Sequence, residues 1–191
     1  MHETEEFCVF VVRTSGRSAA VDDDRREFKL LGKSQLRGLD LARPVTTGVR
    51  SRAVLELQQN SGRLQFRALV GGEFVPGEGD RIAWRVRCWE TVRPTPQQGL
   101  LPGALLPGLP ARLDHAAAMG LWANLNSGAL PAGQLVIDRA GYNQESSPAL
   151  FTTAVKLLVH VLLAGAFGSS VEPVIKSWVA TDRIPDVTAQ S

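Results

Sequence analysis

The stretch from Ser51 to Glu90 is SRAVLELQQNSGRLQFRALVGGEFVPGEGDRIAWRVRCWE, and it decides the fold. Apolar and polar residues alternate in three runs, at 53–58, 63–70 and 81–89. A period of two residues is typical of half-buried strands. Turn residues separate the runs, including Gly71-Gly72 after the second one. We therefore expect three successive strands in an antiparallel meander with one apolar and one polar face.

The polar face of this meander collects cationic side chains. If the strands pair in chain order, one side presents Arg63, Gln65, Arg67, Arg85, Arg87 and Trp89. Guanidinium groups bind phosphates, while amide edges and aromatic planes suit unpaired bases. The pattern predicts a binding face for RNA or another single strand. The alternative is a plain solvent-facing sheet whose charge is balanced by Glu56 and Glu90.

Shorter strands are expected before the meander, so that residues 1–92 form mainly antiparallel sheet. Residues 7–12 are apolar and β-branched, and 18–21 could return as the second strand of an N-terminal hairpin. Residues 27–31 are a further short candidate. Residues 32–48 are polar, contain Pro44 and show no clear period, so we expect them to be mostly irregular.

The second half of the chain is expected to be mainly helical. A Pro/Gly-rich loop at 93–112 precedes a helix near 113–125 and a strand at 134–138. Ser147-Pro148 is a start signal for a helix over 148–164, which Gly165 would end. Ser169 and Glu172 fit a capping box for a last helix to about residue 180, before a polar tail at 182–191.

Length and composition indicate one globular α+β domain. The chain has 191 residues, 44% hydrophobic and 21% charged, with a formal net charge of +2. Arginine outnumbers lysine by 17 to 4, which reflects either phosphate recognition or genomic base composition. Cys8 and Cys88 lie far apart in the sequence and are expected to be buried thiols in a reducing cell.

The sequence shows no recognisable catalytic or metal-binding motif. His2, His115 and His160 are not spaced as ligands on one helix face, and there is no nucleophile elbow or phosphate-binding loop. We therefore expect no cofactor, no metal and no enzyme activity. Catalysis stays an alternative, because an active site assembled from scattered residues leaves no trace in the sequence.

The apolar segment at 150–168 is almost long enough to span a bilayer. It carries Lys156 and His160 near its middle, and a charge at mid-bilayer costs about 2.5–3.5 kcal/mol. We expect a helix covered by protein and no membrane partner. Because it is apolar on every side, a second copy of the chain could supply part of the cover. The expected dimer-interface residues are Leu150, Phe151, Leu157, Leu158 and Leu162.

The order of elements resembles that of the coat proteins of the small single-stranded RNA bacteriophages. The residues that carry the resemblance are the strand–turn–strand at 49–70, the run Leu135-Val136-Ile137, and the two helices at 148–164 and 169–179. The resemblance is one of layout and covers about 120 residues discontinuously. The segment 71–131 has no simple counterpart in that family.

The resemblance implies a capsid protein. Two subunits would interlock, their sheets would join into one surface facing RNA, and helices would lie over the partner's sheet. The chain would self-assemble into a shell, and its location would be the virion and, during assembly, the host cytoplasm. The alternatives are a cellular single-stranded nucleic-acid-binding protein that forms no shell, and an α+β chaperone or adaptor module.

Overall fold

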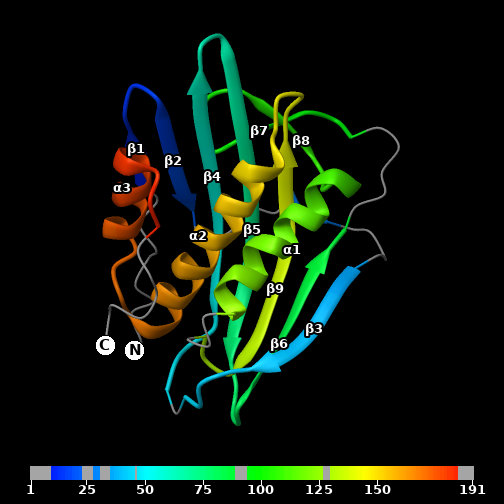
Figure 1. The fold of residues 1–191 in the computed structure, drawn as a ribbon, viewed down its shortest axis with the longest axis vertical. Helices are drawn as coiled ribbons and strands as arrows, with labels where there is room; N and C mark the ends of the chain where they lie inside the picture. The colour runs from blue at the N-terminus through cyan, green and yellow to red at the C-terminus, as the bar shows by residue number, and fades with distance from the viewer. Residues whose placement is uncertain are drawn as a thin grey trace, which may run out of the picture.

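The computed structural model describes residues 10–22, 28–30, 35–45, 47–88, 94–126 and 130–184. In these residues, one mixed sheet has the strand order β1-β2-β4-β5-β9-β6-β3, and three helices pack against it (Figure 1). The expected α+β class is confirmed at this level.

Two antiparallel hairpins form one half of the sheet. The N-terminal hairpin consists of β1 (Phe10–Arg13) and β2 (Arg17–Asp22), and the longer one of β4 (Ser51–Ser61) and β5 (Leu64–Pro76). β2 pairs with β4 and joins them. Gly62 makes the second turn with φ of 60°, a conformation that glycine adopts without strain. Both hairpins agree with the sequence, although residues 7–9 lie outside the described residues.

The expected meander is wrong at its third strand. β6 (Arg81–Arg87) forms, but β9 (Gly133–Tyr142) lies between β5 and β6. β9 is antiparallel to β5 and parallel to β6. Parallel neighbours need a crossover connection, which here contains helix α1 (Ala111–Leu125). The polar face that was expected to be continuous is therefore divided between non-adjacent strands.

Several segments are more regular than expected. β3 (Gln35–Leu41) occupies the stretch expected to be irregular and pairs with β6 at the edge of the sheet. Within the Pro/Gly-rich loop, β7 (Gln97–Gln98) pairs with β8 (Ala104–Pro107), which in turn pairs with the end of β9. Residues 28–30 make only an isolated bridge and backbone hydrogen bonds to β9 instead of a strand.

Gly71 and Gly72 do not end β5, as the sequence suggested. They lie inside the strand, where the pairing register with β9 shifts from Arg139 to Ile137 and leaves Asp138 out. A Cβ atom on Gly72 would lie 2.2 Å from the backbone oxygen of Val136. The glycines therefore permit the close approach of β9 at a bulge.

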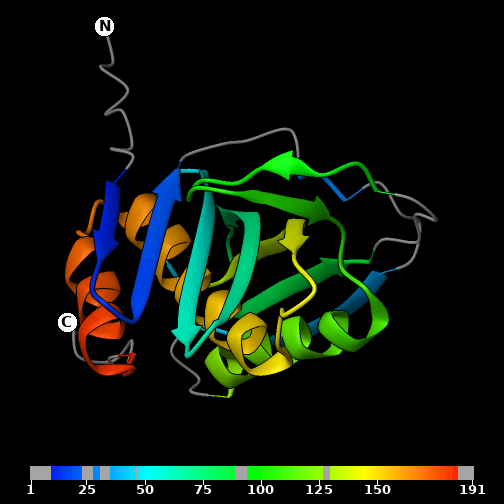
Figure 2. The ribbon, with the colours of Figure 1, turned by 90° about the horizontal axis from the view of Figure 1, so that it is seen from above.

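Helix α1 and helix α2 (Pro148–Phe167) cover one face of the sheet, while β7 and β8 lie on the other side (Figure 2). The Ser147 side chain accepts a hydrogen bond from the Leu150 backbone N–H, as the start signal predicted. α2 continues through Gly165 because Ala166 is buried and the Phe167 ring lies 6.1 Å from Phe74.

Helix α3 (Glu172–Thr181) packs beside the N-terminal hairpin, and its start corrects the expected capping box. Its N-cap is Val171, which makes no side-chain hydrogen bond. The Ser169 backbone N–H instead donates to the oxygen of Ala164 and closes the end of α2.

The residues expected at a dimer interface are buried within the chain. Leu150 is 3% exposed, and Phe151, Leu157, Leu158 and Leu162 are 0% exposed. They face β4, β5, α1 and α3 of the same chain, so no partner is needed to cover them. α2 also has the length and apolar composition of a membrane span, and more than half of that segment is buried in this core.

Candidate nucleic-acid interface

The sheet face turned away from α1 and α2 has a covered part and an open part. Over the covered part, Leu105 of β8 and Phe28 pack on Val54 and Leu69 of the sheet. The open part is carried by β6, β3 and the neighbouring ends of β9 and β5, whose side chains on this face include exposed ones. The residues predicted to bind RNA fall on both parts.

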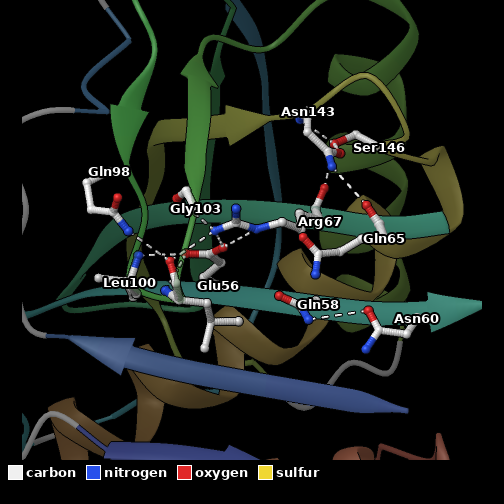
Figure 3. Close-up of polar contacts among 11 residues, drawn as sticks. Glu56, Gln58, Asn60, Gln65, Arg67, Gln98, Leu100, Gly103, Asn143 and Ser146 are labelled. Carbon is white, nitrogen blue, oxygen red and sulfur yellow. Dashed lines mark hydrogen bonds and ion pairs between the residues drawn. The ribbon is translucent and has the colours of Figure 1, made fainter. Parts of the chain in front are cut away.

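Arg67 belongs to the covered part, which corrects its assignment to RNA binding. It is 2% exposed, and its Nε donates to Glu56 Oε1 at 2.8 Å (Figure 3). One of its terminal nitrogens also contacts that oxygen and donates to the backbone oxygens of Leu101 and Gly103. The guanidinium group therefore holds the turn at 99–103 against the sheet and is not available to a ligand.

The partner of Arg67, Glu56, is fully buried. Its second oxygen accepts the backbone N–H groups of Leu100 at 2.6 Å and Leu101 at 3.0 Å. Burial raises the pKa of the Glu56 carboxyl above its ordinary value, whereas the Arg67 charge and the two amides act in the opposite direction. This network fixes the turn at 99–103 against the sheet. It uses the Glu56 carboxylate, which the sequence suggested would balance the arginines of the polar face.

Arg63 and Gln65 are exposed at the tip of the β4–β5 hairpin, away from β6. Gln65 uses its backbone oxygen to accept a hydrogen bond from the Asn143 side chain. Glu73 of β5 lies in the same row of the sheet as Arg85. Gln65 lies eight residues before Glu73 along β5, which separates the two by roughly 26 Å. The structure therefore does not bring Arg63 and Gln65 together with Arg85 and Arg87.

Arg85 and Arg87 lie on β6 and face the open part. Arg85 is exposed and Arg87 half-buried, and their cross-strand neighbours on β3 are Arg37 and Gln35. Arg81, 56% exposed, continues the same side of β6 and lies 3.8 Å from the Asp80 carboxylate. We name Arg37, Arg81, Arg85 and Arg87 the open arginine face. Trp89, the last predicted contact, lies outside the described residues.

The strand registers continue this face across the sheet. One row of paired residues crosses the sheet from β3 through β6, β9 and β5 to β4. In that order its members are Arg37, Arg85, Val136, Glu73 and Arg52. Arg52 is 3.5 Å from Glu73 and 3.6 Å from Asp138. The β4 end of this row is thus neutralised, whereas at the β3–β6 end no carboxylate of the described residues lies at ion-pair distance from Arg37, Arg85 or Arg87.

Two members of the open arginine face were missed by the sequence. Arg37 lies in the segment expected to be irregular, and Arg81 was expected on the polar side of the strand at 81–89 but was not among the predicted contacts. The available signal was Leu39-Asp40-Leu41, a short alternation preceding Pro44. Among the described residues, no group of three or more His, Cys, Asp or Glu side chains could hold a metal ion.

Comparison with known proteins adds no assignment. No family model, no curated protein and no solved structure matches the chain.

Proposed function

We propose that the protein binds single-stranded nucleic acid on the open arginine face. The pair Arg37 and Arg85 carries this proposal, because two exposed guanidinium groups lie directly opposite each other on neighbouring strands. Like charges in this position destabilise a sheet. Within the described residues, no carboxylate lies at ion-pair distance from either. A phosphate bound between them would relieve the repulsion.

The neighbouring residues support an extended ligand. Arg87 and Arg81 lie on the same side of β6 as Arg85, with about 7 Å between positions 85 and 87 and about 13 Å between 81 and 85. Between this strand and β5 lie Val136 and the exposed Gln134 of β9. A chain of phosphates running along β6 would contact several arginines, while unpaired bases would lie over small and polar side chains.

Recognition of this kind favours the backbone over the base sequence. Among the described residues, the charged side chains of the open arginine face are guanidinium groups, whose typical nucleic-acid partners are phosphates. Phosphate contacts position a nucleic acid and carry no sequence information by themselves. We therefore expect a salt-sensitive protein with weak sequence preference.

Charge reversal on the full-length protein tests the proposal. Binding of a labelled single strand on the order of 16 nucleotides is followed by fluorescence anisotropy. R37E/R85E should abolish binding, whereas the control R63E changes the charge of an exposed arginine at the hairpin tip and should leave affinity nearly unchanged. Equal loss in both variants, or no loss in R37E/R85E, would contradict the assigned face.

A coat protein that assembles around RNA is the second candidate function. The observation that favours it is the edge strand β3, which offers a place where another copy can extend the sheet. Electron microscopy of the purified protein with RNA distinguishes the two functions. Closed particles would support the coat function and its virion location, whereas small soluble complexes would support nucleic-acid binding without a shell.

A further inference from the structure

Strand β3 is an open edge of the sheet. Among the described residues it pairs only with β6, so the backbone groups on its other side have no strand partner. Proteins usually protect such edges with lysine, proline, a bulge or a covering element. The opposite edge strand, β1, is only four residues long and has α3 beside it. The seven-residue β3 has neither a lysine nor a proline.

Exposed apolar side chains gather on this strand. Leu36, Leu39 and Leu41 are 37%, 60% and 67% exposed. They are three of the ten large apolar side chains that are exposed in the described part of the chain, although β3 has only seven residues. Leu36 lies on the helix side of the sheet, and Leu39 and Leu41 lie on the open side. The edge therefore exposes leucine side chains on both of its faces.

We propose that β3 pairs with β3 of a second copy, antiparallel and about a two-fold axis through Gly38. All seven residues of each strand then find a partner in the other. The opposed residues are Gln35 with Leu41, Leu36 with Asp40, Arg37 with Leu39, and Gly38 with itself. Each opposed pair lies on one face of the joined sheet, as pleating requires.

The side chains of β3 favour this register over its neighbours. Centring the axis on Arg37 would place the two Arg37 residues opposite each other, and like charges there are destabilising. Centring it on Leu39 would leave Gln35 and Leu36 without opposed residues. Around Gly38, Leu39 meets the aliphatic stem of Arg37, and Asp40 already accepts a hydrogen bond from Trp84 Nε1 at 2.7 Å.

A second copy fits this edge because the strand is complementary to itself. Gly38 lies against the Trp84 ring, where a Cβ atom would come within 2.5 Å, so the centre of the edge is narrow and uncharged. The two-fold axis would be perpendicular to the sheet. It would place the open arginine faces of both copies on the same side. The pairing rests on β3 alone, and does not require the proposed nucleic-acid binding.

Solution mass tests the interface. Sedimentation or light scattering of the full chain should give twice 20.6 kDa, or an assembly built from such pairs. L39K/L41K should reduce this to single chains with an unchanged circular-dichroism spectrum. The control L64K alters a leucine that is 52% exposed at the hairpin tip and should stay dimeric. A single-chain wild type at high concentration, or a dimer that persists in L39K/L41K, would overturn the proposal.

Cross-linking tests the register. In a background with Cys8→Ser and Cys88→Ala, R37C/L39C should form covalent dimers on mild oxidation, because positions 37 and 39 are opposed across the axis. R37C/L41C should not, since 37 and 41 are opposed only when the axis passes through Leu39. Efficient cross-linking of the second variant and not the first would overturn the Gly38-centred pairing. Neither readout involves nucleic acid, so failure here is distinguishable from failure of the proposed function.

Discussion

Arg67 on β5 donates from Nε to Glu56 on β4 at 2.8 Å, and both side chains are almost completely buried. The same two residues bind the turn at 99–103 through its backbone N–H and C=O groups. A charged pair thus replaces an apolar contact beneath the Pro/Gly-rich segment. The contribution of the pair to stability can be tested directly, because removing either member leaves the other as an uncompensated buried charge.

Removing one member of this pair should destabilise the fold. Arg67→Met leaves the Glu56 carboxyl buried without its counter-charge, and we expect the free energy of unfolding to fall by about 3–5 kcal/mol. Urea denaturation followed by circular dichroism measures the change. Arg63→Met, at an exposed position on the same hairpin, is the control and should have little effect. An equally small effect of Arg67→Met would show that the pair does not stabilise the chain.

The pH dependence of stability should report the Glu56 carboxyl. Its pKa is raised by burial, so the folded chain holds this proton more tightly than the unfolded chain does. The resulting stabilisation is complete below the ordinary pKa of 4.5 and is lost as pH rises through the folded-state pKa. Compared with Glu56→Gln, the wild type should therefore lose stability over this range. A wild-type advantage that grows with pH would mean that Arg67 outweighs burial.

Local sequence signals predicted the individual strands and helices better than they predicted which strands lie side by side in the sheet. β4, β5 and β6 follow from alternation, and α2 from Ser147 and its apolar run. The position of β9 depends on hydrogen bonds to strands that precede it by more than 40 residues, and no local pattern encodes that choice. Alternation indicates which side of a strand is polar. It does not indicate which other strand is its neighbour in the sheet.

The candidate site was predictable only in part for the same reason. Arg67 and Arg85 both occupy polar positions in alternating strands, yet one is covered by the turn at 99–103 and the other is exposed. Glu56 was the available warning, because an acid on the adjacent strand and the same face can pair with Arg67. Arg37 could not be found without the pairing of β3 with β6.

Salt dependence should separate phosphate contacts from other binding. If the four residues of the open arginine face contact phosphates, the logarithm of the binding constant should fall with the logarithm of salt concentration with a slope of about −3. R37Q/R85Q should reduce the slope to about −1.5, because two contacts are lost. Anisotropy titrations between low and physiological salt measure both slopes. A wild-type slope near zero would exclude the phosphate contacts on which the proposed function depends.

Helix α2 should behave as an internal core helix. Leu158→Ala removes a fully buried side chain, and we expect a loss of about 2–5 kcal/mol in unfolding free energy. Leu163→Ala, at a half-buried position of the same helix, should cost less. Neither variant should change the solution mass of the folded protein, because Leu158 is fully buried within its own chain. A shift to smaller species without loss of stability would restore the interface that the sequence suggested for this helix.

The bulge between β5 and β9 should tolerate no side chain at Gly72. A Cβ atom there would lie 2.2 Å from the Val136 backbone oxygen, so Gly72→Ala must push β9 away from β5. β9 joins the half of the sheet that carries the hairpins to the half that carries β6 and β3. We therefore expect a loss of at least about 1–3 kcal/mol in unfolding free energy, as for other overpacked sites, together with weaker binding at the open arginine face.

A matched glycine distinguishes this clash from a general effect of replacing glycine. Gly16 has no atom within 4 Å of the position that a Cβ atom would occupy, so Gly16→Ala should be close to neutral. Thermal unfolding and anisotropy of the two variants provide the comparison. Equal stability of Gly72→Ala and Gly16→Ala would mean that β9 does not approach β5 so closely. The register that aligns Arg52, Glu73, Val136, Arg85 and Arg37 would then have to be revised.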